Sequence, residues 1–238
     1  MIKLYILCCI CYSMRNVAVL DFAEKLGDKR VYSVKQDVIY ELSTSPTTAY
    51  RYLKDLKSLG IAKFNTKHSG HFILNKSVIS QRHIFQELLP SLKALKNARR
   101  FGREYGRNES DINFTMNNIS HKMVTLDYKA WDLTKFQYPS NLYLYVDDVD
   151  RTATYLKERR FREGKNGQVV ILPPIGDFTN EIQRVYLDCI ANGGRSINDA
   201  IAIHIQHGDH LKFKAKFPLE SIMKVKEELP NGVPSVTA

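Results

Sequence analysis

Three groups of side chains in the second half of the chain are of types that could do chemistry. The first group contains Asp111, Asp127 and Lys129. In metal-dependent cleavage of a phosphodiester bond, carboxylates hold the metal ion and a lysine helps to activate water. An Asp-x-Lys triplet is also common by chance, and an aspartate at the end of a strand often caps the following turn. A metal-dependent nuclease is therefore kept as an alternative function.

The other two groups are better explained by local structure. His204 and His207 lie one helical turn apart and could bind zinc together with Asp209 or His210. We expect Gly208 to end that helix, however, and histidines near a helix C-terminus interact favourably with the helix dipole. An acidic cluster follows a predicted strand and comprises Asp147, Asp148 and Asp150. We expect it to cap the next helix rather than to bind Mg²⁺. The second half thus predicts no catalytic residue, no metal site, no cofactor and no enzymatic activity.

Positive charge is concentrated in the first half of this 238-residue chain, whose formal net charge is +10. Residues 1–107 contain 19 Lys and Arg against 8 Asp and Glu, whereas residues 108–238 contain 16 against 17. The composition is otherwise that of a globular protein, with 44% hydrophobic and 25% charged residues. A basic module joined to a neutral one favours a polyanionic partner for the first half.

A helix predicted from Pro46 to Leu59 could meet such a partner. Ser45 is a favourable N-cap, and Pro46 suits the first helical position because a helix start leaves that N–H unpaired anyway. The predicted buried stripe contains Ala49, Leu53, Leu56 and Leu59. The side chains left facing outward are Thr47, Thr48, Tyr50, Arg51 and Lys54. Residues of these types contact base edges and phosphates in nucleic acids.

The elements around this helix predict a winged helix-turn-helix. Two helices, at residues 16–27 and 34–42, precede it, and a hairpin at residues 61–75 follows. In that fold the third helix enters the major groove of DNA, and the hairpin forms the wing. We therefore predict binding to double-stranded DNA through the five outward side chains and through the wing residues Lys63, Lys67 and His68. A winged helix that serves only as a scaffold is the alternative.

The predicted fold class is α+β, with an N-terminal winged helix-turn-helix and a C-terminal mixed α/β domain. The expected divisions are an apolar extension at 1–14, the winged helix at 15–78, a basic connecting helix at 79–108, the α/β domain at 109–229 and a loose tail at 230–238. Strands are expected at residues 121–128, 141–148, 168–174 and 210–217, with helices between them. The domain boundary is expected near residues 102–110. The basic segment 93–107 favours either a second phosphate-contacting surface or a solvated connector.

The cysteines favour a reduced, cytoplasmic protein. Cys8, Cys9 and Cys11 are clustered, Cys189 is distant, and none has the spacing of a zinc finger. The apolar run from Leu4 to Tyr12 is far shorter than the roughly 20 residues that span a bilayer, so we expect no membrane association. A signal-peptide core is the alternative, although no small-residue cleavage motif follows it.

Motifs along the second half resemble those of the AbiEi-like antitoxins and their stand-alone archaeal relatives. They are Leu172-Pro173-Pro174, Tyr186-Leu187-Asp188, Gly193-Gly194-Arg195 and Asp199-Ala200, in this order after the winged helix. The resemblance implies a promoter-binding antitoxin of a type IV toxin–antitoxin system. Such a protein represses its own operon and counters a nucleotidyltransferase-type toxin without forming a stable complex.

The same resemblance implies DNA contacts at Thr47, Thr48, Arg51 and Lys54. It is compatible with a homodimer. The apolar start of the chain and the basic segment 93–107 depart from the family pattern. These departures leave a stand-alone regulator without a toxin partner as an alternative.

Overall fold

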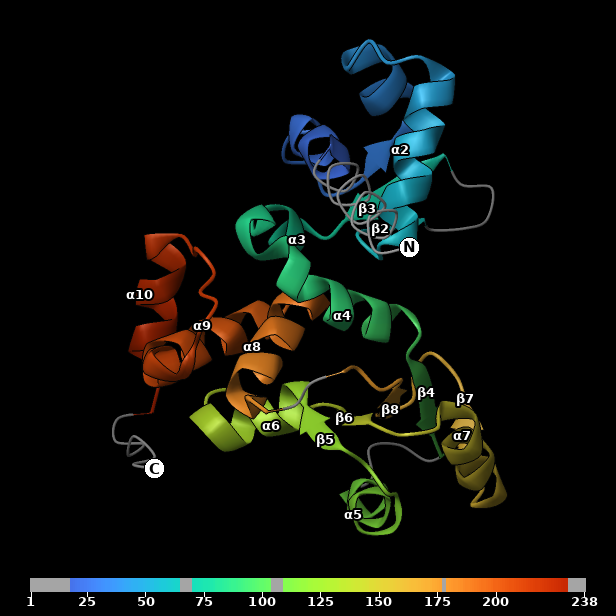
Figure 1. Cartoon of the computed structure of the whole chain (residues 1–238), viewed down its shortest axis with the longest axis vertical. Helices are drawn as coiled ribbons and strands as arrows, with labels where there is room; N and C mark the ends of the chain where they lie inside the picture. The colour runs from blue at the N-terminus through green and yellow to red at the C-terminus, as the bar shows by residue number, and fades with distance from the viewer. Residues whose placement is uncertain (1–17, 65–69, 104–108, 177–178, 231–238) are drawn as a thin grey trace, which may run out of the picture. The chain divides into compact units, whose positions relative to one another are not determined.

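The structure, a computed structural model, describes residues 18–64, 70–103, 109–176 and 179–230 (Figure 1). The chain divides into two compact units, Met1–Phe85 and Gln86–Ala238. Each unit contains its own β-sheet together with several helices. The predicted α+β class is therefore confirmed. The segment 102–110, where we expected the boundary, lies inside the second unit.

The first unit consists of short helices and a three-stranded antiparallel sheet with the order β1-β3-β2. Its elements in chain order are a helix at residues 18–25, β1 (Tyr32–Ser33), the π-helix η1 (Val34–Glu41), α2 (Pro46–Ser58), β2 (Ala62–Phe64), β3 (His71–Leu74), α3 (Lys76–Ile79) and the 3₁₀-helix η2 (Arg82–Ile84). The three helices up to Ser58 and the pair of strands β2 and β3 follow the order that the sequence predicts.

Local sequence signals fix both ends of α2. The Ser45 hydroxyl accepts a hydrogen bond from the backbone N–H of Thr48 at 3.2 Å, and Pro46 is the first helical residue. Beyond the other end, Gly60 has a φ of 75°, which glycine adopts without strain. The predicted apolar stripe is buried in full, at Ala49, Leu53, Leu56 and Leu59. Burial stabilises the packed helix by about 1.5–3 kcal/mol for each leucine.

The second unit is built on a five-stranded sheet with the order β5-β6-β8-β4-β7. Its elements in chain order are α4 (Phe85–Lys96), β4 (Arg99–Gly102), α5 (Glu109–Asn118), β5 (Met123–Thr125), α6 (Leu126–Thr134), β6 (Leu142–Tyr145), α7 (Val149–Glu158), β7 (Arg162–Glu163), β8 (Val169–Leu172), α8 (Glu181–Asn192), α9 (Ser196–His207), η3 (Gly208–His210) and α10 (Leu219–Glu228). Strands β6 and β8 are parallel, and the other neighbours are antiparallel. The sheet is therefore mixed, as predicted.

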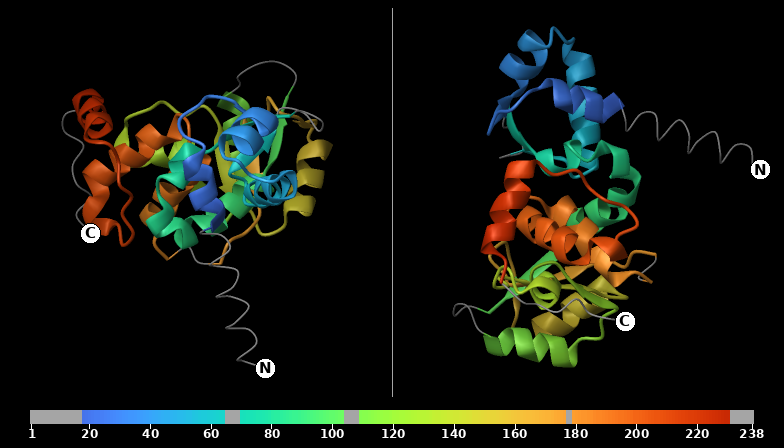
Figure 2. Two further views of the ribbon diagram at one scale, coloured as in Figure 1. Left: turned by 90° about the horizontal axis from the view of Figure 1, so that it is seen from above. Right: turned by 90° about the vertical axis from the view of Figure 1, so that its left-hand side faces the viewer.

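Helices cover both faces of this sheet. On one face, Leu144 of β6 and Ile171 of β8 share a core with Ile112 of α5 and Leu156 of α7. Helices α4 and α8 lie on the opposite side of the sheet (Figure 1 and Figure 2). Because β6 and β8 are buried on both faces, successive side chains of these strands belong to different layers.

Two predictions about this unit were wrong, and two of its elements were missed. The segment 79–108 is not one connecting helix, because α4 ends at Lys96 and Arg99–Gly102 forms the strand β4. Residues 210–217, which the structure describes throughout, form no strand. Helix α5 and strand β7 were not predicted at all. In β4, pairing with the distant strand β8 overrides a local sequence that favours a helix.

No helix in the described part of the chain is both long and apolar enough to cross a membrane. Cys189 is a free, buried cysteine, and burial raises the pKa of its thiol well above the usual value. Cys8, Cys9 and Cys11 lie outside the described residues, as do the predicted extension 1–14 and the tail from residue 231.

Candidate nucleic-acid interface

The outward side of α2 presents four exposed polar side chains: Thr47, Tyr50, Arg51 and Lys54. Positions spaced by three and four residues lie on the same side of a helix. These four residues therefore form one surface, which we call the α2 face. Tyr50 is 61% exposed, which is a high exposure for a large aromatic side chain. Such a surface can contact a ligand without any rearrangement of the helix.

The start of α2 suits an anionic ligand. Thr48 is half-buried, and its hydroxyl accepts a hydrogen bond from the Ser45 hydroxyl at 3.0 Å. The first turn of α2 contains no acidic residue. The positive end of the helix dipole is therefore not opposed by a carboxylate on that turn.

The basic side chains near the α2 face have no ionic partner within the described residues. Neither Arg51, Lys54 nor Lys63 forms an ion pair with another described side chain. The Arg51 guanidinium lies 5.4 Å from the centre of the Tyr52 ring, which orients its planar group without neutralising it. Lys57 similarly lies 5.5 Å from the centre of the Phe64 ring.

Three other basic residues of the same unit are neutralised by carboxylates. Lys29 pairs with Asp37 at 2.6 Å, and Arg82 pairs with Asp21 at 2.8 Å. Lys76 pairs with Asp28. The positive charge of the first unit is thus cancelled in these places. It is left uncancelled along α2 and β2, and also at the exposed residues Lys25, Arg30 and Lys35, which form no ion pair with a described side chain. Electrostatic attraction of a polyanion depends on such an uncancelled local field.

The hairpin of β2 and β3, which we predicted to be a wing, is described only in part. Lys63 on β2 is exposed and lies opposite Ile73 of β3 in the antiparallel register. Lys67 and His68, which we predicted to contact DNA, lie outside the described residues. Their role stays a prediction.

The described part of the basic segment, residues 93–103, does not offer a row of free cations. Arg99 forms two hydrogen bonds with Glu163, at 2.7 and 2.8 Å, and a third with Asp150 at 2.9 Å. The Arg99 guanidinium lowers the pKa of Glu163 to about 2. Arg100 donates to the Tyr143 hydroxyl at 2.9 Å. These arginines stabilise the second unit, which argues against a phosphate-contacting surface here.

The residues of the nuclease alternative are held by separate partners. The Asp127 carboxylate accepts hydrogen bonds from the backbone N–H groups of Ser140 and Asn141, at 3.2 and 3.0 Å. Lys129 instead faces Glu181, with 3.5 Å between Nζ and Oε2. The third member, Asp111, pairs with Arg103. Asp127 lies in the first turn of α6 and binds the loop before β6, 13 and 14 residues away, rather than capping the turn that directly follows it.

The histidine and aspartate clusters also have structural partners. His207 is buried, and its Nε2 lies 3.0 Å from the carbonyl oxygen of Leu133. Burial lowers the pKa of His204, whose ring packs near Tyr186. The three aspartates of the acidic cluster have different partners. Asp148 caps α7, Asp147 pairs with Lys122, and Asp150 pairs with Arg99. Within the described residues, no three His, Cys, Asp or Glu side chains are grouped to hold a metal ion.

A buried polar network in the second unit was missed in the sequence. Asp188 of α8 accepts hydrogen bonds from the hydroxyls of Thr125, at 2.6 Å, and Tyr145, at 2.9 Å. Burial raises the pKa of Asp188, which is fully enclosed. Nearby, Arg184 donates to Ser91 at 3.0 Å. The only sequence signal was the Tyr-Leu-Asp motif, which does not reveal its partners.

A second buried carboxyl predicts a pH dependence of stability. Asp199 is 4% exposed, and its Oδ1 has no hydrogen-bond partner among the described residues. Its pKa is raised to about 7, mainly by burial and also by the neighbouring Asp127, while Arg195 opposes the shift. The folded protein therefore retains this proton at pH values where the unfolded chain has lost it.

Raising the pH from 5 to 8 should consequently destabilise the protein at this site. The proton favours the folded state, so its contribution is fully present below the ordinary aspartate pKa of 3.8 and is lost progressively as the pH rises to about 7. In Asp199→Asn this loss is absent. Between pH 5 and pH 8 we expect the unmodified protein to lose about 2–3 kcal/mol more in the free energy of unfolding than the variant does. Urea denaturation at each pH measures the difference. The exposed Asp209→Asn is the control. Parallel pH profiles for Asp199→Asn and the unmodified protein would contradict the assignment.

Comparison of the chain with protein-family models, with curated proteins and with solved structures gives no match.

Proposed function

We propose that this protein is a DNA-binding transcription regulator whose first unit acts as a winged helix-turn-helix. In this function α2 occupies the major groove, and Arg51 and Tyr50 reach base edges while Lys54 and Lys63 contact phosphates. The observation that carries the proposal is the α2 face, whose cations Arg51 and Lys54 are not neutralised by any described carboxylate. The first turn of the same helix contains no acidic residue. The excess of Lys and Arg in residues 1–107 supports the same partner.

We further propose that the regulator is an AbiEi-like antitoxin. This rests on the resemblance of the motifs in the second half, which include Asp188 and Asp199. In that function the first unit represses the operon, and the second unit counters a nucleotidyltransferase-type toxin without a stable complex. A stand-alone regulator would share the DNA-binding step and lack the toxin. Co-expression with a nucleotidyltransferase-like neighbour tests this part, because an antitoxin restores growth.

The DNA-binding proposal is tested by fluorescence anisotropy of the full chain on its own upstream duplex and on a scrambled duplex of the same composition. We expect tighter binding to the upstream duplex and loss of this preference in Arg51→Ala, because a guanidinium can hold a base edge bidentately. Lys224→Ala, which removes an exposed cation from α10 of the second unit, should leave the preference unchanged. Equal affinity for both duplexes would overturn the proposal of sequence reading.

A salt series on the same duplex identifies the phosphate contacts. A plot of log K against log salt concentration has a negative slope, whose magnitude grows by roughly 0.9 for each phosphate that the protein neutralises. Lys54→Ala should therefore reduce the magnitude of this slope by about 1 while keeping the preference for the upstream duplex. A slope identical to that of the unmodified protein would show that Lys54 makes no phosphate contact.

A further inference from the structure

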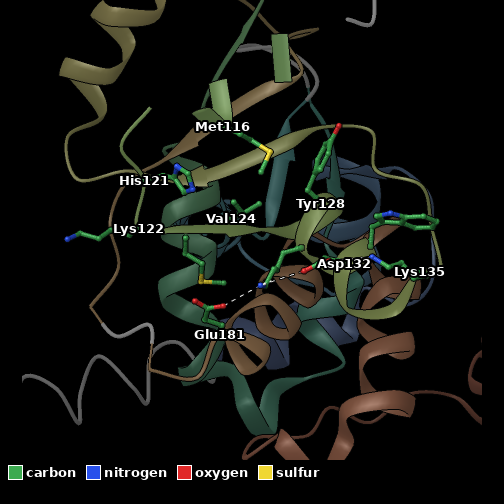
Figure 3. Close-up of a pocket in the computed structure, with 11 residues that line it drawn as sticks. Met116, His121, Lys122, Val124, Tyr128, Asp132, Lys135 and Glu181 are labelled. Carbon is green, nitrogen blue, oxygen red and sulfur yellow. Dashed lines mark hydrogen bonds and ion pairs between the residues drawn. The ribbon is translucent and has the colours of Figure 1, made fainter. Parts of the chain in front are cut away.

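A pocket of about 650 Å³ lies in the second unit, between α5, β5, α6 and the start of α8 (Figure 3). Its volume is in the range of sites that enclose small molecules. One part of its lining is apolar or aromatic and contains Met116, Met123, Val124, Tyr128 and Trp131. The other part is polar or charged: Lys129, Asp132, Lys135 and Glu181 form one group, and His121 and Lys122 lie at the β5 side. The pocket thus combines flat apolar walls with hydrogen-bonding groups.

The charged part of the lining offers both donors and acceptors. Lys129 lies 3.5 Å from Glu181 and 3.8 Å from Asp132, and Lys135 lies 3.4 Å from the same Asp132. Two ammonium groups and two carboxylates balance in charge, so the pocket does not select for a strongly charged ligand. Contacts of this length near solvent contribute little energy, and a ligand can replace them at small cost. The dashed lines in Figure 3 mark the pairs of Lys129 with Asp132 and Glu181.

The aromatic walls keep part of their surface exposed, although the Trp131 ring packs edge-on against Tyr138, with 5.7 Å between the ring centres, and its centre lies 5.7 Å from Lys135 Nζ. Tyr128 and Trp131 are both half-buried. Met116 is 36% exposed, and in Figure 3 its side chain extends toward the space between His121 and Tyr128. Aromatic rings and methionine sulfur both pack well against flat π-systems. Lys122, by contrast, points away from the other labelled side chains and pairs with Asp147 outside the lining.

The wall of the pocket is held in a strained conformation. Leu126, at the junction of β5 and α6, is fully buried and has a φ of 53°, in the left-handed region that side chains of its size rarely adopt. Such strain costs about 1–3 kcal/mol and persists only where neighbours impose it. Those neighbours are Thr125, which is bonded to Asp188, and Asp127, which is bonded to Ser140. The junction is thus fixed in the geometry that places Val124 and Tyr128 in the pocket.

We propose that this pocket binds a nucleobase, either of a free nucleotide or at the end of a single strand. A nucleobase is flat and carries donors and acceptors side by side on its edge. Its faces match Tyr128 and Trp131, and its edge matches the carboxylates and ammonium groups around Lys129. Neither a purely apolar ligand nor a bare phosphate uses both parts of the lining. This site is separate from the proposed DNA-binding surface of the first unit and does not depend on it.

The chain's only tryptophan is Trp131, so its fluorescence reports directly on this pocket. The experiment titrates the full chain with adenosine and guanosine monophosphates, with ribose 5-phosphate and with a short single-stranded oligonucleotide, and equilibrium dialysis confirms binding. We expect saturable quenching by at least one nucleotide and none by ribose 5-phosphate. Tighter binding of the oligonucleotide would identify a strand end as the source of the base.

Two variants test the edge contacts. Lys129→Gln and Glu181→Gln should each weaken nucleotide binding about tenfold, whereas Lys224→Gln on α10 should not. Both pocket positions are on the outside of helices, and thermal melting checks that the variants are folded. Lack of saturable binding up to millimolar nucleotide would overturn the proposal. Equal binding of ribose 5-phosphate would overturn it as well, because the site would then recognise an anion and not a base.

Discussion

The double variant Arg51→Glu/Lys54→Glu should lose on the order of 100-fold in affinity for duplex DNA at 0.1 M salt. Both side chains are exposed on the α2 face and have no ionic partner among the described residues. Their charge is therefore available to DNA, and reversing it places two carboxylates next to the phosphates. Fluorescence anisotropy with a labelled upstream duplex measures the change.

The matched control is Lys224→Glu/Lys226→Glu on α10. It changes the net charge by the same amount at two exposed positions of the second unit. We expect a loss of severalfold at most, because only the long-range field changes. If both double variants lost affinity equally, net charge alone would account for binding and the α2 face would have no special role.

Removing the buried carboxylate in Asp188→Ala should lower the free energy of unfolding by about 3–5 kcal/mol. The substitution leaves the hydroxyls of Thr125 and Tyr145 without their acceptor, in a region closed to water. It also removes the countercharge near Arg184, whose Nε is itself buried without a hydrogen-bond partner. Urea denaturation of the full chain, followed by circular dichroism, measures the loss.

Two further variants separate this network from a general effect of losing an aspartate. Asp188→Asn keeps one acceptor and should cost less than Asp188→Ala. Asp132→Ala removes an exposed carboxylate and should change stability by less than about 1 kcal/mol. A cost for Asp188→Ala as small as that for Asp132→Ala would show that the hydroxyls find other partners.

The elements of the first unit could be predicted because their signals are local. The N-cap Ser45, Pro46 and the spacing of four apolar residues define α2 within one stretch of chain. The exposure of Arg51 and Lys54 follows from the same spacing. Their lack of ionic partners could not be predicted, because pairs such as Arg82 with Asp21 join residues far apart in sequence.

The segment 210–217 shows how a correct burial pattern can give a wrong element. Its alternation correctly places Leu211 and Ala215 inside, yet the backbone pairs with no strand. Side chains of α8 take the place of a neighbouring strand. Gln183 both accepts from the N–H of Phe213 and donates to its carbonyl oxygen, and the Tyr186 hydroxyl accepts from the N–H of Ala215. Alternation with a period of two predicts which side chains are buried, but not which groups form hydrogen bonds with the backbone N–H and C=O groups.

The second unit's polar sites were beyond prediction for a related reason. Thr125, Tyr145 and Asp188 come from three elements, and only the packing of α8 on the sheet brings them together. The same holds for the pocket near Trp131, whose charged wall joins α6 to Glu181 of α8. Individually these residues are unremarkable in the sequence, so spacing alone carries no signal for them.

The most direct test of the central claim is hydrogen–deuterium exchange of the full chain, alone and bound to its upstream duplex. We predict added protection in the first turns of α2, residues 46–54, because DNA in contact with this surface restricts the opening of the helix start. The first turn of α10 should exchange at the same rate in both samples. Unchanged exchange across residues 46–54, with protection instead in the second unit, would contradict the assignment of DNA binding to α2.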